Sequence, residues 1–167
     1  MAQEQGRSVS VTALETRPVL QGARLTTFEL THKGVPTTLI CDNMMLVPQQ
    51  PPCRRNFVGC DRVATNGDFA NKIGTFTLAA IAQRFHVPFY VCMPSTTIDF
   101  DAQNMHDIEI EFRNPEEVRS LWYEKPMVAA EAEILNPAFD CTPRDFVTGY
   151  ITEKGILAPP FTKEMFE

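Results

Sequence analysis

The chain has 167 residues, enough for one domain with a single buried core. Its composition, 44% hydrophobic and 22% charged, is that of a folded globular protein and excludes a disordered one. The net charge is -6, and the 15 lysines and arginines form no basic stripe, so we expect no nucleic-acid partner.

The apolar stretches of the sequence are short. None reaches the roughly 20 residues of a membrane span, and the N-terminal segment has no signal-peptide core. We therefore expect no membrane partner and a cytoplasmic location, with the nucleus as a second compartment. The five cysteines include no C-x-x-C pair, which predicts neither a zinc site nor a disulfide framework.

Strands and helices alternate along the first half of the chain. The patterns predict a strand over 8–16, a loop and helix over 17–34, strands over 35–42 and 56–61, a helix over 69–86 and a strand over 87–94. Continuously apolar strands such as FYVCM are typical of strands covered on both faces. The alternation predicts an α/β fold, a doubly wound, mostly parallel sheet with helices on both faces.

The pattern is weaker elsewhere. Residues 108–112 predict a short alternating strand, and residues 114–123 predict a helix with Asn114 as its N-cap. The Pro-rich segment 48–52 stands where a parallel crossover normally has a helix. It is either a short turn with an extended loop, or one sheet face is bare there.

Polar residues crowd around the predicted strand-to-helix corner near Asp61. Asp61 is the first polar residue after the strand, at the carboxyl end where ligands bind in open α/β sheets. A poorly solvated aspartate there has a raised pKa and can act as an acid near neutral pH. The alternative is a structural carboxylate that pairs with Arg62 or caps a turn.

A turn and the start of the helix follow this aspartate. Residues 66–68 predict a turn, with Asp68 as the N-cap of the helix. Asn71 and Lys72 then fall in the first helical turn, where backbone N–H groups attract anions. Because a lysine is unfavourable against the helix dipole, it indicates a phosphate or carboxylate ligand. The sequence has neither a Walker loop nor a G-x-G-x-x-G motif, so we expect no nucleotide cofactor.

Four motifs carry a family resemblance. They are ETRPVLQGARLT (15–26), GCDRVATNGDFANKIGT (59–75), PFYVCMPSTTID (88–99) and NPAFDCTPRDFVTGYITEKG (136–155). In this order they closely resemble the methylthioribose-1-phosphate isomerase family. The related regulatory subunits of the translation-initiation exchange factor share the N-K-I-G-T core but usually lack the acidic residue after G-x and the N-G-D. Asp61 and Asp68 therefore favour the isomerase branch.

The resemblance implies an enzyme with a Rossmann-like domain over residues 1–167. The enzyme is an intramolecular oxidoreductase that converts 5-methylthioribose 1-phosphate into 5-methylthioribulose 1-phosphate in methionine salvage, without cofactor or metal. Asp61 is then the proton donor that opens the sugar ring, and Gln21, Asn71 and Lys72 bind the substrate. The implied partners are a small phosphorylated sugar and a second copy of the chain in a homodimer. Ribose-1,5-bisphosphate isomerisation is the nearest competing activity, and the N-G-D motif disfavours it.

The resemblance covers the C-terminal half of the family's sequence. The family's N-terminal helical domain, with its Arg-Gly-Ala phosphate-binding stretch, and its catalytic cysteine just before the E-T-R-P motif are absent from these residues, so we expect little or no turnover by the isolated chain. Cys60 stands where the family commonly has alanine and is no substitute. Two other interpretations remain open: a non-catalytic interaction or regulatory subunit related to the exchange-factor subunits, and a piece of a longer gene product.

Overall fold

The computed structural model of the chain describes residues 5–45 and 53–166. Two compact units divide the chain, Met1–Pro48 with Asn114–Ile134, and Gln49–Arg113 with Leu135–Glu167. The single domain over residues 1–167 stays a prediction. The Pro-rich segment 48–52, for which the sequence left two alternatives, lies outside the described residues.

The first unit is a parallel strand pair with a helical crossover. Its elements are β1 (Val11–Leu14), a π-helical turn (Gly22–Thr26), α1 (Thr27–His32), β2 (Thr37–Ile40), a 3-10 turn (Asp42–Met44) and α3 (Glu116–Arg119). β1 and β2 pair in parallel, with Val11 opposite Thr37, which confirms the predicted strand–helix–strand order. The helix predicted over 114–123 is shorter, Glu116–Arg119, and its N-cap is Pro115 instead of Asn114, although Asn114 Oδ1 accepts a 2.9 Å hydrogen bond from the N–H of Glu116.

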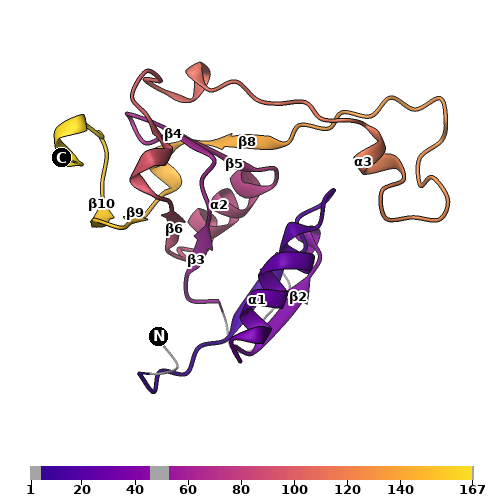
Figure 1. The fold of residues 1–167 in the computed structure, drawn as a ribbon, viewed down its shortest axis with the longest axis horizontal. Coiled ribbons are helices and arrows are strands. Elements are labelled where there is room, and N and C mark those ends of the chain that lie inside the picture. The colour runs from indigo at the N-terminus through magenta and orange to yellow at the C-terminus, as the bar shows by residue number, and fades with distance from the viewer. Residues whose placement is uncertain (1–4, 46–52, 167) are drawn as a thin grey trace. The chain divides into compact units, whose positions relative to one another are not determined.

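The second unit holds two four-stranded sheets. Its strands are β3 (Asn56–Val58), β4 (Arg62–Ala64), β5 (Phe69–Lys72), β6 (Phe89–Cys92), β7 (Ile98–Asp99), β8 (Phe139–Thr142), β9 (Gly149–Thr152) and β10 (Gly155–Leu157). The β3 sheet has the order β10-β9-β6-β3, and the β5 sheet has the order β7-β4-β5-β8. Helix α2 (Thr75–Arg84) packs against β8 and β6 (Figure 1).

Parallel and antiparallel pairs are mixed in both sheets. The pairs β3–β6, β6–β9 and β4–β7 are parallel, whereas β4–β5, β5–β8 and β9–β10 are antiparallel. The α/β class predicted from the sequence is confirmed by this combination of parallel strands with helices. The antiparallel pairs of the β5 sheet, β4–β5 and β5–β8, are the part of the fold that the alternation of strands and helices did not indicate.

The prediction of one helix over residues 69–86 is wrong. Residues Phe69–Lys72 form strand β5, and the helix begins at Thr75 and ends at Arg84. β5 lies between β4 and β8, both antiparallel to it, so its backbone groups bond to the neighbouring strands instead of to a following helical turn. A tight turn that contains Gly67 (φ +96°) joins β4 to β5 as a hairpin.

Two shorter predictions also differ from the structure. The strand predicted over residues 56–61 ends at Val58, and a separate strand, β4, begins at Arg62. The alternating segment 108–112 does not form a strand. It contributes only a single β-bridge, between Phe112 and Pro137. In both places the local pattern was compatible with a strand, but the partner backbone available in the fold decided its extent.

The core of the second unit lies between α2 and the two sheets. Its buried side chains are Val63, Phe69, Ala79, Ala82, Phe89, Val91, Met93, Ile98, Tyr150 and Phe161. The Tyr150 ring meets the rings of Phe69 and Phe161 edge-on, with centroids 6.5 and 5.2 Å away, and its hydroxyl donates to the carbonyl of Gly67. Through Tyr150, the core therefore contacts both the turn and the strand β5 of the β4–β5 hairpin and holds the hairpin in place.

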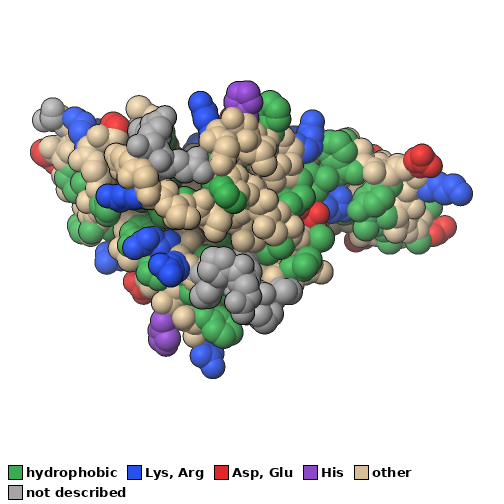
Figure 2. All heavy atoms as spheres, turned by 90° about the horizontal axis from the view of Figure 1, so that it is seen from below, with side chains coloured by type: hydrophobic (Ala, Val, Ile, Leu, Met, Phe, Trp, Pro, Cys, Tyr) green, Lys and Arg blue, Asp and Glu red, His purple; other side chains and the backbone are tan. Residues whose placement is uncertain are grey.

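The surface carries charges of both signs. Figure 2 shows one face, on which lysine and arginine side chains lie scattered among hydrophobic and acidic ones. On the β3 sheet, Phe57 and Ile156 are exposed, and the Phe57 ring stacks on Tyr90 with centroids 5.7 Å apart. Within the described residues, every helix is too short or too polar to cross a membrane.

Candidate functional site

Asp61 lies directly before β4, in the link that follows β3. Its backbone N–H donates a 2.9 Å hydrogen bond to the carbonyl of Ala70 in β5. This bond fixes Asp61 beside the strand that carries Asn71 and Lys72, which are the two residues after Ala70. The structure therefore brings together three of the four site residues that the sequence predicted, at one edge of the β5 sheet.

Two opposing effects act on the carboxyl of Asp61. The protein packed around it withdraws part of its hydration and raises its pKa, and the ammonium of Lys72 lowers it. The net direction is upward from the ordinary value of 3.8, so desolvation is the larger effect. One side of Asp61 remains exposed, which leaves the carboxyl accessible to a ligand.

Lys72 stands at the end of a strand and not in the first turn of a helix. Its Nζ lies 4.3 Å from the centroid of the Phe139 ring, on the neighbouring strand β8, in a cation–π arrangement. The prediction that Lys72 opposes a helix dipole is therefore wrong. The ammonium of Lys72 instead packs against an aromatic ring, and it lies close enough to Asp61 to lower the pKa of its carboxyl.

Asn71 uses one side of its amide for an internal contact. Its Nδ2 donates to Thr75 Oγ1 at 2.9 Å. A Cβ added to Gly59 would lie 3.4 Å from Asn71 Oδ1, about van der Waals contact, so this oxygen lies near the backbone of Gly59. The side chain is half-buried, and its orientation leaves Oδ1 as the atom that can accept a hydrogen bond from a ligand.

The backbone N–H groups at the start of α2 are not the open anion site that the sequence predicted. Asp140 Oδ2 accepts from the N–H of Gly74 at 2.7 Å, and Asp140 Oδ1 accepts from the N–H of Phe76 at 3.1 Å. Burial raises the pKa of Asp140, and the two N–H groups lower it, with a net rise. The carboxylate of the chain itself thus occupies the positive end of the helix.

Asp68 is also placed differently from its prediction as a helix N-cap. The side chain is buried and accepts hydrogen bonds from Asn66 Nδ2 (2.8 Å) and from the N–H groups of Met105 (3.2 Å) and Arg144 (2.9 Å). Burial raises the pKa of Asp68, but these hydrogen bonds outweigh it and the net pKa is lowered. Asp68 therefore ties the hairpin turn to two other loops, and the turn predicted at Asn66–Asp68 is confirmed.

Gln21 belongs to the first unit, directly before the π-helical turn. Its Oε1 is buried without a hydrogen-bond partner, and so is Nη1 of Arg17 in the same loop. The other nitrogen of that guanidinium, Nη2, donates to the carbonyl of Val118 at 3.3 Å. The role of Gln21 in substrate binding stays a prediction.

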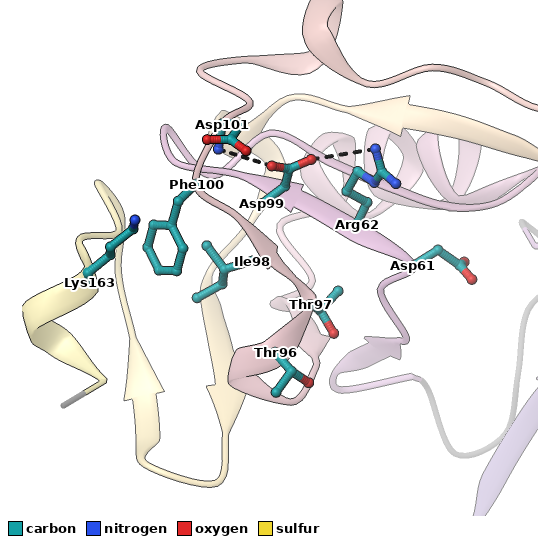
Figure 3. A pocket seen from close by; sticks show the side chains of 9 residues that line it. All are labelled: Asp61, Arg62, Thr96, Thr97, Ile98, Asp99, Phe100, Asp101 and Lys163. Carbon is teal, nitrogen blue, oxygen red and sulfur yellow. Dashed lines mark hydrogen bonds and ion pairs between the residues drawn. The ribbon is translucent and has the colours of Figure 1, made fainter.

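A hollow of about 490 Å³ lies beside Asp61 and Arg62. Arg62 and Asp99 point toward one another across it and form an ion pair at 3.5 Å, whereas the carboxyl of Asp61 points away from them (Figure 3). Arg62 thus pairs with Asp99 and not with Asp61, which argues against the ion pair considered for Asp61, whereas the turn-capping alternative stays a prediction. The described residues contain no group of three His, Cys, Asp or Glu side chains placed to hold a metal ion.

Cys60 is a poor candidate for a nucleophile. Burial, followed by the negative charge of Asp61, raises the pKa of its thiol to about 12. A thiol with such a pKa stays protonated near neutral pH, and the thiolate is the reactive form. This agrees with the prediction from the sequence that Cys60 has no catalytic role.

Sequence reasoning missed Asp140 and Thr75. Both lie inside the family motifs, but no local pattern marks either one as part of the site. Asp140 reaches α2 across 66 residues of sequence, and Thr75 looks like an ordinary first residue of a helix. The one available signal was an aspartate in an otherwise apolar strand segment, AFDCT.

The mixed sheets and the helix packed on them define an α/β protein in which Asp61, Asn71 and Lys72 lie together at one edge of the β5 sheet. Residues 1–159 match the model of the initiation factor 2 subunit family, and the chain belongs to that family. The resemblance inferred from the four sequence motifs is thereby confirmed.

Curated relatives in the family are named methylthioribose-1-phosphate isomerase. The protein of Symbiobacterium thermophilum is 51% identical over 168 residues, covering 100% of this chain and 47% of the relative. That of Parabacteroides distasonis is 50% identical over 158 residues, covering 94% of this chain and 47% of the relative. The chain spans about half the length of the curated relatives it matches.

Solved structures show the same fold. The 5-methylthioribose 1-phosphate isomerase from Pyrococcus horikoshii OT3 has a TM-score of 0.89 and 41% identity, covering 99% of this chain and 47% of that one. Subunit delta of the translation initiation factor eIF-2B from A. fulgidus has a TM-score of 0.88 and 40% identity, covering 95% and 46%. The fold is thus shared by proteins named as isomerases and as initiation-factor subunits.

Proposed function

We propose that this chain is the part of a methylthioribose-1-phosphate isomerase that carries the acid of the reaction and a site for a small phosphorylated sugar. The reaction converts 5-methylthioribose 1-phosphate, an aldose, into the ketose 5-methylthioribulose 1-phosphate in methionine salvage. The observation that carries the proposal is the meeting of Asp61 with Asn71 and Lys72 at one edge of the β5 sheet. The 51% identity to a relative of that name supports the choice of substrate.

In this proposal Asp61 supplies the proton that opens the sugar ring. The phosphate on C1 blocks spontaneous opening, so an acid must protonate the ring oxygen. The bond between C1 and that oxygen then breaks, a hydrogen moves from C2 to C1, and the C2 hydroxyl loses its proton as it becomes the ketone, which balances the proton taken up by the ring oxygen. Partial burial raises the pKa of Asp61 and keeps more of the carboxyl protonated near neutral pH, which suits an acid.

Lys72 and Asn71 are the proposed substrate-binding residues of the same edge. The Nζ of Lys72 supplies a positive charge for the phosphate, and the Phe139 ring fixes its place without neutralising it as a carboxylate would. Asn71 donates to Thr75 through Nδ2, which leaves Oδ1 to accept a hydrogen bond from a sugar hydroxyl. Gln21 in the first unit is the further substrate-binding residue that the family resemblance implies.

A second candidate function is that of a non-catalytic regulatory subunit. The likeness to subunit delta of eIF-2B from A. fulgidus, 40% identical over 95% of this chain, favours it. A regulatory subunit needs no acid at position 61. The two candidates therefore differ in whether function depends on the carboxyl of Asp61.

A chimaera tests the proposal. In it this chain replaces the matching half of the Symbiobacterium thermophilum relative, to which it is 51% identical over its whole length. We expect the chimaera to convert 5-methylthioribose 1-phosphate into the ketose, followed by NMR. Its Asp61→Asn variant is expected to lose about 10²–10⁴-fold in kcat, the usual contribution of a general acid. The chain by itself is expected to show little or no turnover.

The control variant is Asp145→Asn, which removes an exposed carboxylate that pairs with Arg144. Its kcat is expected to stay within about twofold of the chimaera's, as for most surface substitutions. Ribose 1,5-bisphosphate serves as the competing substrate and is expected to be converted more slowly. A folded chimaera that binds the substrate without converting it, or an Asp61→Asn variant with an unchanged rate, contradicts the proposal and favours the regulatory subunit.

A further inference from the structure

We propose that Asp140 is a positioning residue that sets where Asn71 and Lys72 stand, acting through the start of α2 and the hydroxyl of Thr75. The inference rests on the proposed function, because it takes Asn71 and Lys72 as substrate-binding residues. Asp140 acts through its neighbours and does not itself contact the substrate. Three sets of contacts in the second unit lead to this role.

The first contacts hold the turn between β5 and α2. After Lys72 the chain passes through Ile73 and Gly74 and enters the helix at Thr75. The carboxylate of Asp140 accepts the N–H of Gly74 through one oxygen and the N–H of Phe76 through the other. Gly74 has a φ of +99°, a left-handed conformation with little to restrain it locally. The carboxylate therefore brackets Thr75 from both sides and fixes the turn.

The second contacts pass from Thr75 to the site. Thr75 Oγ1 donates to the carbonyl of Lys72 at 2.7 Å and accepts from Asn71 Nδ2 at 2.9 Å. Thr75 is buried, so water has little access to take the place of either partner. The orientation of the Asn71 amide and the backbone of Lys72 both depend on where Asp140 holds the first helical turn.

The third contacts come from strand β8. In the antiparallel register Asn71 lies opposite Asp140, and Lys72 lies opposite Phe139. The ring of Phe139 receives the ammonium of Lys72, and the next residue, Asp140, holds the turn that follows Lys72. Two consecutive residues of β8 thus position two consecutive residues of β5, one by ring contact and one through the helix.

The test uses the chain itself and the place of the Lys72 ammonium. Reductive ¹³C-methylation of the lysines gives Lys72 an NMR signal that the facing Phe139 ring shifts upfield, assigned with a Lys72→Arg variant. We expect Asp140→Asn and Thr75→Val to move this signal toward that of exposed lysines. We also expect them to raise the apparent Kd for 5-methylthioribose 1-phosphate about tenfold, the effect of losing one or two hydrogen bonds.

Two matched variants separate positioning from general destabilisation. Thr75→Ser keeps the hydroxyl and is expected to keep both the Lys72 signal and the Kd, whereas Thr75→Val keeps the shape and loses the hydroxyl. Asp145→Asn removes an exposed carboxylate on the same unit and is expected to change neither reading. Should Asp140→Asn fail to fold, the contrast between the two Thr75 variants still tests the contacts.

The outcomes for the two proposals are distinct. Folded Asp140→Asn and Thr75→Val variants with the wild-type Lys72 signal and Kd overturn the positioning role. A wild-type chain that binds no 5-methylthioribose 1-phosphate counts against the proposed function. In that case the NMR signal of Lys72 decides the positioning role. If Asp140→Asn and Thr75→Val shift the signal, the role is supported, and if neither shifts it, the role is overturned.

Discussion

At the scale of the residue, two aspartates seven positions apart have opposite pKa directions. Asp61 precedes β4, where burial raises its pKa against the pull of Lys72. Asp68 is a buried residue, yet the hydrogen bonds that it accepts from Asn66, Met105 and Arg144 lower its pKa. The number of donors that face each carboxylate, and not its depth alone, decides the direction. The sequence identified both residues but could not distinguish them in this way, because the donors come from distant loops.

The raised pKa of Asp61 predicts how stability changes with pH. A carboxyl with a raised folded-state pKa contributes most below its ordinary value of 3.8, and that contribution is lost as the pH rises through the higher folded value. Asp61→Asn has no charge to desolvate. We therefore expect its Tm, relative to that of the wild type, to be higher at about pH 7 than at about pH 3.5.

The measurement is thermal unfolding of both proteins at the two pH values. Asp145→Asn controls for the loss of one negative charge from a chain with a net charge of -6. The quantity compared is the Tm of Asp61→Asn minus the Tm of the wild type. If this difference is smaller at the higher pH than at the lower pH, the direction assigned to the Asp61 pKa is contradicted.

At the scale of the element, the strand β5 and the π-helical turn each depend on backbone from another part of the chain. Phe69–Lys72 becomes a strand because β4 and β8 flank it, although its own residues fit a helix as well. The π-helical turn begins at Gly22, where the chain passes the carbonyl of Leu14. The sequence predicted a helix in this second region and could not predict the close approach, because Gly22 and Leu14 meet only in the folded unit.

The close approach at Gly22 predicts a severe effect of adding one methyl group. A Cβ at this position would lie 1.8 Å from the carbonyl oxygen of Leu14 and 2.7 Å from Thr16 Oγ1. Because the nearest atom is backbone, the strand must move away. We expect Gly22→Ala to lower the free energy of unfolding by about 3 kcal/mol or more.

Urea unfolding measures this change, and hydrogen exchange of the β1 amides locates it. Leu25→Ala in the same turn is the matched control, since Leu25 is 59% exposed. Its effect is expected to stay within about 0.5 kcal/mol. Equal effects of the two substitutions would show that the contact with Leu14 is not what limits this position.

At the scale of the whole molecule, the second unit depends on one shared core. Side chains from α2, the β3 sheet and the β5 sheet meet there, and Phe69 lies in it fully buried, edge-on to Tyr150. Phe69 lies on β5, the same strand as Asn71 and Lys72. The core therefore supports the same strand that carries the candidate site.

This shared core predicts a large difference between buried and exposed apolar residues. Phe69→Ala leaves a cavity between the sheets, and we expect it to lower the free energy of unfolding by about 3–5 kcal/mol. Leu135→Ala, at a side chain that is 77% exposed in the same unit, is expected to cost less than about 0.5 kcal/mol. Urea unfolding of both variants measures the difference, and similar costs would place Phe69 outside the cooperative core.

The sequence by itself determined the α/β class, the turn at Asn66–Asp68, the family and three polar residues near one corner. These depend on local patterns and on motifs, which a sequence displays directly. The tertiary structure decided that Asn71 and Lys72 stand on a strand, that Phe139 receives the ammonium of Lys72, and that Asp140 occupies the start of α2. The reason is that β5 pairs with a strand about 70 residues further along the chain, and no local propensity reports such a partner.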